Sequence, residues 1–467
     1  MNLVYKVNDR PGVGKTIVFA FQQLLAILAA TIAVPAIVGN GMSQSAALFG
    51  AGVGTLVYLL FTKFRSPVFL GSSFAFLGSM FAAFAGAISA EAGYAGLLIG
   101  AASAGLVYVI IALIVKFAGV KWIYKLMPPV VIGPTVAIIG LSLAGNAVGD
   151  VLSNSVYDAG ASAYALNSAT AWIGLLCGLI TVAVVILCSV FGKKTLKLIP
   201  FIVGILAGYG VAAIFTIIGI ATGNDTLKII NFDLFQNMQW LPDFTFLKAF
   251  KGFKDLNGNY IASILVAYVP VAFVVFAEHI ADHKNLSTVI GSDLLQDPGL
   301  HRTLLGDGVG SIAGAFFGGC PNTTYGESVG CVAITGNASV ITIVVTAIMC
   351  LVASFVAPFV TFLATIPSCV MGGVCITLYG FIAVSGLKML QGVDLGDNRN
   401  LFTVSVILIC GIGGFALKIG QVTLTDVACA LILGILVHLL VAIKKDDPAP
   451  AEAAKPEEEK VEEQDQV

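Results

Sequence analysis

The sequence predicts an all-α protein that crosses a membrane many times. Hydrophobic residues make up 58% of the 467 residues and charged residues only 11%. A soluble domain of this length could not enclose so large an apolar core. Apolar stretches of about 20 residues, enough to cross the hydrocarbon layer, recur from residue 17 to residue 443. The first stretch is too long for the hydrophobic part of a signal peptide, so we expect it to be retained.

Basic residues alternate between the two predicted sides of the membrane. The loops near residue 40, near residue 91 and at 147–168 contain no Lys or Arg, whereas the loops between them do. Lys and Arg accumulate in cytoplasmic loops, so both termini are expected in the cytoplasm, which requires an even number of spans. Fourteen fits: twelve of near-spanning length and two short ones near 72–86 and 325–337. The basic residues of the cytoplasmic side are Lys6, Arg10, Lys15, Lys63, Arg65, Lys116, Lys121, Lys125, Lys193, Lys194 and Lys197.

One loop disagrees with this charge pattern. Residues 221–258 should be external, yet they carry four lysines, among them Lys248, Lys251 and Lys254. This loop is also the longest polar insertion and lies between the seventh and eighth predicted spans. It therefore marks the midpoint of the chain.

The two halves resemble each other. Pro128 precedes Gly133 by five residues, and Pro367 precedes Gly372 by the same spacing, in segments rich in small residues. The sequences GSSFAF (71–76) and TTYGES (323–328) each open a short helix. With seven spans per half, the repeats would be inverted in the membrane, and interrupted segments at matching positions indicate a transporter's midplane site. Chance resemblance among glycine-rich spans is the alternative.

Each short helix follows a brief extended stretch. Irregular backbone at membrane depth must be buried in protein or line a cavity, because unpaired backbone groups cost several kcal/mol in lipid. A half-helix that begins there points its free N–H groups at the cavity. The N–H groups near Phe74, Gly326 and Glu327 are thus candidate donors to a ligand. In the alternative, Ser73 and Thr324 are ordinary helix caps.

Three carboxylates occur at or beside apolar segments. Glu278 and Asp282 are four residues apart and so share one helical face. Glu327 comes first after the start of the second half-helix. Charges at membrane depth usually face a substrate or ion path. Structural pairing within the bundle is the alternative for Glu278, and a local salt bridge is the alternative for Asp282.

The remaining polar and aromatic candidates are weaker. His279 should point away from Glu278 and hydrogen-bond to another helix. Phe74 and Tyr325 are candidate walls for a flat aromatic ligand, with core packing as the alternative. The nine cysteines lack the spacing of metal ligands. We expect no metal, no cofactor, no nucleic-acid partner and, without a nucleophile–base pair, no enzyme.

Several motifs together resemble the nucleobase–ascorbate transporter family, in particular bacterial uracil permeases. They are QQLLAILAATIAVP, LGSSFAF, AEHI, DLLQDPGLHRTLLGDG, PNTTYGESVGCVAIT and IPSCVMGGV, within residues 10–443. The resemblance implies two inverted repeats of seven segments, a homodimer in the bacterial inner membrane, and two domains. The core domain would comprise residues 1–125 and 259–360, and the gate domain residues 126–222 and 361–445. Residues 223–258 are then an extramembrane loop, and 446–467 an acidic disordered cytoplasmic tail.

The resemblance also implies functional residues. Glu278 and Glu327 match the family's binding glutamates, and Phe74 and Gly326 match its backbone donors, with Tyr325 beside them. Asp282 departs from the pattern, because uracil permeases typically have histidine there. The expected activity is proton-coupled uracil import, with Glu327, Glu278 and Asp282 in coupling and an elevator-like movement of the core. Alternatives are a purine (xanthine-type) or sodium-coupled permease, or an anion carrier or channel on the same fold.

Overall fold

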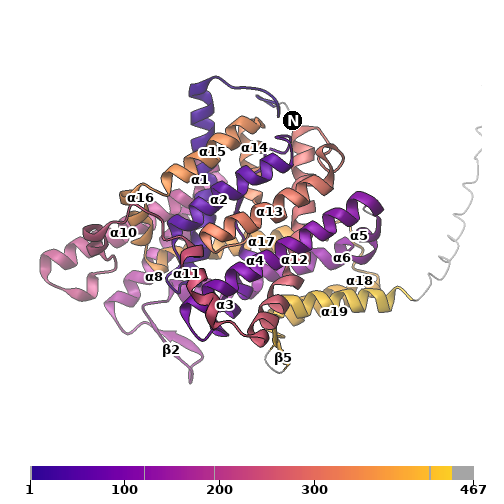
Figure 1. Ribbon diagram of the computed structural model, residues 1–467. Helices are drawn as coiled ribbons and strands as arrows, with labels where there is room; N and C mark the ends of the chain where they lie inside the picture. Colours follow the sequence, from indigo (N-terminus) through magenta and orange to yellow (C-terminus); the bar gives the residue numbers. More distant parts are fainter. Residues whose placement is uncertain (1–2, 120, 194, 420–421, 444–467) are drawn as a thin grey trace, which may run out of the picture.

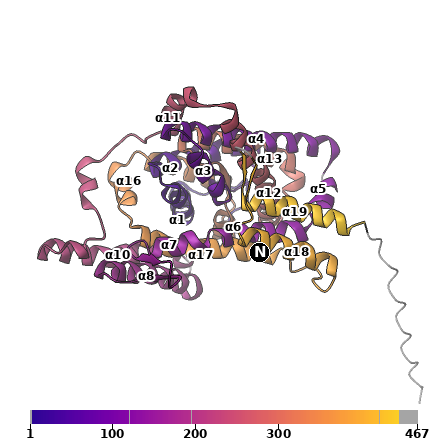
Figure 2. The same ribbon diagram turned by 90° about the horizontal axis from the view of Figure 1, so that it is seen from below.

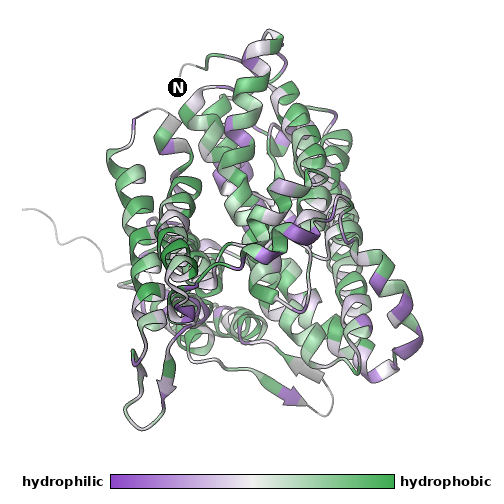
Figure 3. Ribbon diagram, turned by 90° about the vertical axis from the view of Figure 1, so that its left-hand side faces the viewer, coloured by the Kyte–Doolittle hydropathy of each residue, from purple (hydrophilic) through white to green (hydrophobic). Residues whose placement is uncertain are grey.

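The computed structural model describes residues 3–119, 121–193, 195–419 and 422–443 as a bundle of helices (Figure 1). The predicted acidic tail at 446–467 lies outside these residues. Most helices are coloured as hydrophobic along much of their length, and many of the hydrophilic residues lie near helix ends and in loops (Figure 3). This pattern is that of a protein whose outer surface faces lipid.

The first half of the chain runs to the end of α10. Its elements are α1 (Val13–Val38), α2 (Gln44–Phe61), β1 (Leu70–Ser72), η1 (Phe74–Phe76), α3 (Leu77–Ala85), α4 (Ala90–Ala118), α5 (Lys121–Leu126), α6 (Pro129–Ser142), α7 (Ala144–Val151), β2 (Val156–Asp158), β3 (Ala163–Ala165), α8 (Ala169–Phe191), α9 (Thr195–Leu198) and α10 (Pro200–Thr222).

The second half follows a loop made of η2 (Asp225–Leu227), η3 (Phe232–Asn237), α11 (Thr245–Gly252) and η4 (Phe253–Asp255). Its elements are α12 (Gly258–Ile290), η5 (Leu295–Gly299), α13 (Leu300–Gly318), β4 (Asn322–Thr324), α14 (Gly326–Thr335), α15 (Val340–Ala353), α16 (Ala357–Ala364), α17 (Ser368–Lys388), α18 (Asn398–Ile412), β5 (Leu417–Ile419), β6 (Val422–Leu424) and α19 (Asp426–Val441).

Side-chain caps fix where several long helices begin. Ser43, Ser89, Ser168 and Asn257 each accept a hydrogen bond from a backbone N–H in the first turn of α2, α4, α8 and α12. Such caps satisfy donors that have no partner inside the helix. Long apolar segments therefore start at defined residues.

Eight of the described helices are long and apolar enough to cross a membrane, or nine if the bent pair α15–α16 counts as one span. Three shorter apolar helices cover Phe74–Ala85, Asn398–Ile412 and Asp426–Val441. The protein is therefore a helical multi-pass membrane protein. The number fourteen stays a prediction.

Two three-residue strands join the halves inside the bundle. β1 pairs antiparallel with β4, with Leu70 opposite Thr324 and Ser72 opposite Asn322. All six residues are buried. The short helices begin directly afterwards, η1 and α3 after β1 and α14 after β4. The extended stretches predicted ahead of the two short helices are thus each other's partners.

The helices pack in two groups, and each group contains helices from both halves of the chain. In one group, α2 packs on α13, α4 on both α13 and α12, and α15 on both α1 and α2. In the other, α6 packs on α17 and α18, α17 on α8, α8 on α10, and α18 on α19. Several of these contacts recur between the two halves of the chain: α8–α10 in the first half is matched by α18–α19 in the second, and α6–α18 is matched by α17–α8. Figure 2 shows α8, α10 and α17 on one side of the molecule, with α2, α3 and α4 on the other.

Glycines allow α2 and α13 to touch backbone to backbone. A Cβ atom added at Gly50 would lie 2.3 Å from the carbonyl oxygen of Gly314, and one at Gly310 would lie 2.7 Å from that of Gly54. The glycines repeat every fourth residue on both helices, as in close-packed membrane helix pairs. We call this contact between the glycines of α2 and α13 the glycine seam. Asn322 adds a hydrogen bond to it, because its Nδ2 donates to Gly50 O at 3.1 Å.

We predict that Gly50→Ala destabilises the protein by about 1–3 kcal/mol, since the new methyl group meets backbone that cannot move aside. The matched control is Gly210→Ala on α10, where an added Cβ has no atom within 4 Å. Thermal unfolding of the purified proteins in detergent should show a lower Tm for Gly50→Ala only. Equal Tm values would mean that the seam can widen.

Candidate functional site

The functional candidates gather at a cavity of about 430 Å³ between the two helix groups. Its volume lies in the range of small-ligand sites. α12 and α14 form one wall, and α6, α10 and α17 form much of the other. The lining residues are Ala26, Val136, Ser189, Lys197, Pro200, Phe201, Glu278, Ala281, Asp282, Asn285, Gly326, Glu327, Val329, Gly330, Cys331, Ile334, Phe381, Ile382, Ser385 and Met389.

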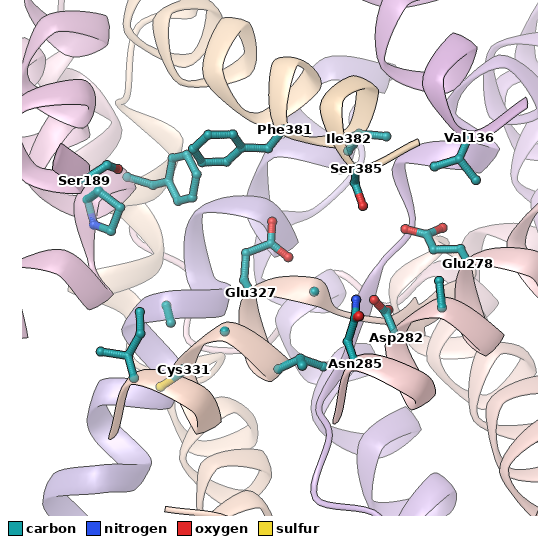
Figure 4. Close-up of a pocket in the computed structure, with 18 of the residues that line it drawn as sticks. Val136, Ser189, Glu278, Asp282, Asn285, Glu327, Cys331, Phe381, Ile382 and Ser385 are labelled. Carbon is teal, nitrogen blue, oxygen red and sulfur yellow. The ribbon is translucent and has the colours of Figure 1, made fainter. Parts of the chain in front are cut away.

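Three carboxylates face this cavity. Glu278 and Asp282 lie one turn apart on α12, and Glu327 lies in the first turn of α14. In Figure 4, Glu327 points across the space toward Phe381 and Ser385, and the two α12 acids face the same space from the side. All three are half-buried. The first N–H groups of α14 have no partner inside the helix and form the positive end of its dipole, next to Glu327.

Asp282 is held by a residue of the strand pair. Thr324 Oγ1 donates to Asp282 Oδ2 at 2.8 Å. The alternative role for Thr324, as the cap of the second half-helix, is not what the structure has: the capping position is Tyr325, and no side chain caps it. Ser73 also makes no side-chain cap. Thr324 instead ties β4 to the acidic face of α12.

The position of α14 is fixed at both ends. At its start, Ser328 Oγ accepts from Gln23 Nε2 of α1 and from the Phe69 N–H, the latter at 3.0 Å. At its end, Gly336 O accepts from the Val4 N–H at 2.8 Å. The N-terminal segment of the chain and α1 thereby hold the short helix that carries Glu327.

The wall opposite the carboxylates is mostly apolar. Val136, Phe201, Phe381 and Ile382 supply it, and Ser385 adds one hydroxyl. Figure 4 shows Phe381, Ile382 and Ser385 on one helix, α17, facing the acids. A ligand here would meet charge on one side and a smooth hydrocarbon surface on the other.

Phe74 and Tyr325 lie elsewhere. Phe74 lines a separate cavity of about 170 Å³ with residues of α6, α12 and α19, and its ring lies edge-on to Tyr379 at 5.7 Å between centroids. Tyr325 is buried, with its hydroxyl donating to Ser72 O at 2.8 Å. Its ring lies so close to Gly71 that a Cβ there would be 2.3 Å away. The large cavity therefore brings together Glu278, Asp282, Gly326 and Glu327.

A buried polar network behind α12 was not predicted in full. His279 points away from the cavity, as expected, and its Nδ1 lies 2.7 Å from Asp307 Oδ2 on α13, while its Nε2 lies 3.0 Å from Thr303 Oγ1. His283 stacks on His279 with ring centroids 4.0 Å apart, and its Nε2 lies 2.7 Å from the hydroxyl of Tyr58. Asp307 was missed, although an acid within GDGVGSIAG was a visible signal.

The arrangement suits binding rather than bond chemistry. Ionised carboxylates accept hydrogen bonds, and helix N–H groups donate them. A small, neutral, planar molecule with both donors and acceptors would find partners for each edge. In the described part of the chain, no three His, Cys, Asp or Glu side chains are grouped to hold a metal ion.

Comparison with known proteins identifies the family. Residues 14–420 match the Permease family of xanthine and uracil permeases. The chain belongs to this family. It is the nucleobase–ascorbate transporter family that the motifs resemble, so that prediction is confirmed.

The similar proteins are transporters. A uracil permease of Bacillus caldolyticus is 41% identical over 94% of each chain, and one of Bacillus subtilis is 38% identical over 95% of this chain and 96% of that one. The transmembrane domain of a cyanobacterial bicarbonate transporter, BicA, shares the fold with a TM-score of 0.60 at 18% identity, covering 92% of this chain and 97% of that one. The protein is therefore a permease, not an enzyme.

We predict that His279 and Asp307 depend on each other for stability. His279→Leu leaves a carboxyl group buried without its partner, which costs about 3–5 kcal/mol. Asp307→Leu leaves only a neutral ring nitrogen unpaired, which costs about 1–3 kcal/mol. The double variant should unfold later on heating than the sum of the single losses requires. Strict additivity of the Tm changes would show that the pair is not coupled.

Proposed function

We propose that the protein imports uracil by proton symport. The observation that carries the proposal is the meeting of Glu278, Asp282 and Glu327 in one cavity of a permease whose relatives are uracil permeases. Uracil is neutral and planar, with two N–H donors and two carbonyl acceptors. Glu278 and Glu327 would accept from the N–H groups. The Gly326 N–H at the start of α14 would donate to one carbonyl.

We assign the second carbonyl to the Phe74 N–H; because Phe74 lines a separate cavity in this structure, the site would have to close around uracil to bring the two together. Phe74 begins η1, the short 3-10 helix that follows β1, just as Gly326 begins α14 after β4. Because β1 and β4 are paired, the N–H groups of Phe74 and Gly326 lie at the starts of two matching half-helices. Tyr325 would support the site through its contacts with Gly71 and Ser72. Each polar group of the ligand left without a partner in a dry site would cost about 1–3 kcal/mol. Full pairing of uracil's edge is the basis of its recognition.

The movement that we propose is an elevator-like displacement of the core domain (1–125 and 259–360) along the gate domain (126–222 and 361–445). The two helix packing groups fall on either side of these boundaries, and their repeated contacts support fourteen segments in two inverted repeats. The acids belong to the core side and the apolar wall belongs to the gate side. An apolar wall offers no fixed hydrogen bonds to break as the core moves.

Coupling to protons would follow from the crowding of acids. Three carboxylates around one small cavity repel each other when all are ionised. Proton uptake by Glu327, with Glu278 and Asp282 sharing charge, would make the loaded core less charged and able to pass the apolar gate. A bound ligand can bias this step only through different affinity for the two states.

The proposed orientation is that both termini are cytoplasmic in the bacterial inner membrane, with a homodimer formed through the gate. Lys197 lines the cavity and belongs to a loop whose basic residues indicate the cytoplasmic side. The structure would then be the inward-facing state, open for release of uracil to the cytoplasm.

Asp282 supports one alternative. Its place is histidine in typical uracil permeases, so a xanthine-type substrate or sodium coupling is the second candidate. An anion carrier is the candidate of a different class. The chain shares only its fold with a bicarbonate transporter. Three acids and one lysine around the cavity disfavour an anion.

The proposal is tested by uptake of labelled uracil into proteoliposomes, with pH and sodium gradients imposed separately. Accumulation should follow the pH gradient alone, and excess unlabelled uracil should compete better than xanthine or hypoxanthine. Accumulation driven only by sodium, or competition only by purines, would select the second candidate.

Glu278→Gln should weaken uracil binding more than tenfold, or by about 1.5 kcal/mol, because an amide accepts poorly and presents an NH₂ to a donor. Calorimetry on purified protein measures this. Glu91→Gln, an exposed acid in the first turn of α4, is the control and should bind as wild type does. Near wild-type affinity of Glu278→Gln would remove it from the site.

Glu327→Gln should retain some uracil binding and exchange, because its amide oxygen can still accept a hydrogen bond, but lose pH-driven accumulation, because the variant has no titratable group there. Exchange and net uptake are measured in the same proteoliposomes. Accumulation that persists under a pH gradient would place the proton on another group, with Asp282 the first to test.

A further inference from the structure

The loop between the halves carries an exposed apolar surface, here called the α11 patch. Five large side chains of this loop are 43–65% exposed: Trp240, Leu241, Leu247, Phe250 and Phe253. So many exposed large apolar side chains between residues 240 and 253 indicate a contact with something other than water. Lys251 and Lys254 lie among them and are exposed.

The inner face of α11 is fixed to the start of α4. Thr245, Ala249 and Gly252, spaced along one face, are buried. A Cβ at Gly252 would lie 2.0 Å from Glu91 O, so the helix touches the backbone of the first turn of α4. Figure 2 shows α11 at the edge of the molecule beside α4.

Lys248 fixes the rotation of α11 on this support. Its ammonium lies 2.5 Å from Asp243 and 4.7 Å from the centre of the Tyr94 ring. Partial burial disfavours its charge, but the hydrogen bonds to Asp243 and Tyr94 raise the pKa of Lys248 above its usual value overall. Lys248 is therefore a structural cation, unlike Lys251 and Lys254.

Stacked phenylalanines connect the patch with the bundle. Phe246 stacks on Phe316 of α13 at 4.8 Å between centroids, and Phe250 lies 5.9 Å from Phe246. At about 100° per residue, Leu247 and Lys251 fall on the side of α11 opposite Ala249, and Phe250 lies on its flank. The outward face thus has an apolar flank beside a basic one.

We propose that the α11 patch lies in the headgroup region of the membrane, where Lys251 and Lys254 contact the phosphates of anionic lipids. α11 sits on the first turn of α4, a 29-residue span, so its depth is that at which a span leaves the hydrocarbon layer. Trp and Lys beside apolar side chains are typical of this depth. Lysines bound to lipid phosphate also explain why this loop departs from the charge pattern of the other external loops.

Trp240 provides a direct probe, because the chain has only three tryptophans. With Trp122→Phe and Trp172→Phe, Trp240 is the sole emitter. The protein is placed in vesicles in which either phosphatidylcholine or phosphatidylglycerol carries bromine near the glycerol end of its chains. We expect Trp240 to be quenched by both, and about fivefold more effectively per molecule by the anionic lipid at low salt.

Lys251→Gln and Lys254→Gln should each reduce this preference about twofold, and high salt should remove most of it. Lys228→Gln is the matched control, because Lys228 lies in the same loop but is ion-paired with Asp225 at 2.6 Å. It should leave the preference unchanged. If a lysine variant fails to fold, quenching of Trp240 in the protein that keeps both lysines still tests whether the α11 patch lies in the membrane.

Three results would overturn the proposal. Trp240 quenched by aqueous iodide but not by brominated lipid would place the patch in water. Quenching that weakens as the protein-to-lipid ratio rises would mean that a second copy covers the patch. Equal quenching by the two lipids at low salt would remove the role of the lysines. None of these results bears on uracil transport, so the two proposals stand or fall separately.

Discussion

The pairing of β1 with β4 is the constraint on which the site depends. Backbone N–H and C=O groups in the interior of a membrane protein need partners from the protein itself. Each strand of three residues supplies the partners of the other. The chain can therefore stop in mid-bundle, leave an extended stretch, and start a new helix with its N–H groups free. Without the pairing, both α3 and α14 would begin beside unsatisfied backbone.

Polar side chains reinforce this pair from several directions. The Thr324 hydroxyl donates to Asp282, and the Tyr325 hydroxyl donates to Ser72 O. The Ser328 hydroxyl oxygen accepts hydrogen bonds from Gln23 and from the Phe69 N–H. Behind α12, His279 and Asp307 join α12 to α13. The acids that face the cavity thus stand on a framework that is held together by buried hydrogen bonds. The opposite wall, made of Val136, Phe381 and Ile382, has no such network among the described residues.

Much of this arrangement was predictable, because it depends on local pattern. The spacing of Glu278 and Asp282 placed them on one helical face, and TTYGES predicted a helix start beside Glu327. The pairing of 70–72 with 322–324 was not predictable, because three residues carry too little pattern to specify a partner about 250 residues away. Asp307 was visible in the sequence as an acid among small and apolar residues, but no local pattern paired it with His279, 28 residues away. Phe74 was expected at the ligand site, but its ring lies edge-on to Tyr379 of α17 and it lines a separate cavity, a placement that depends on packing between segments far apart in the sequence.

The glycine seam between α2 and α13 has a mechanical consequence. Two backbones in direct contact have no side chains that can reorient to absorb a displacement, so the pair transmits force as a stiff beam. Compliance must reside where the side chains are long and have several rotamers. Met389 on the cavity wall is such a side chain, since it is unbranched and has three rotatable bonds. Stiffness and softness are thus assigned to different faces of the same bundle by the size of the residues that meet there.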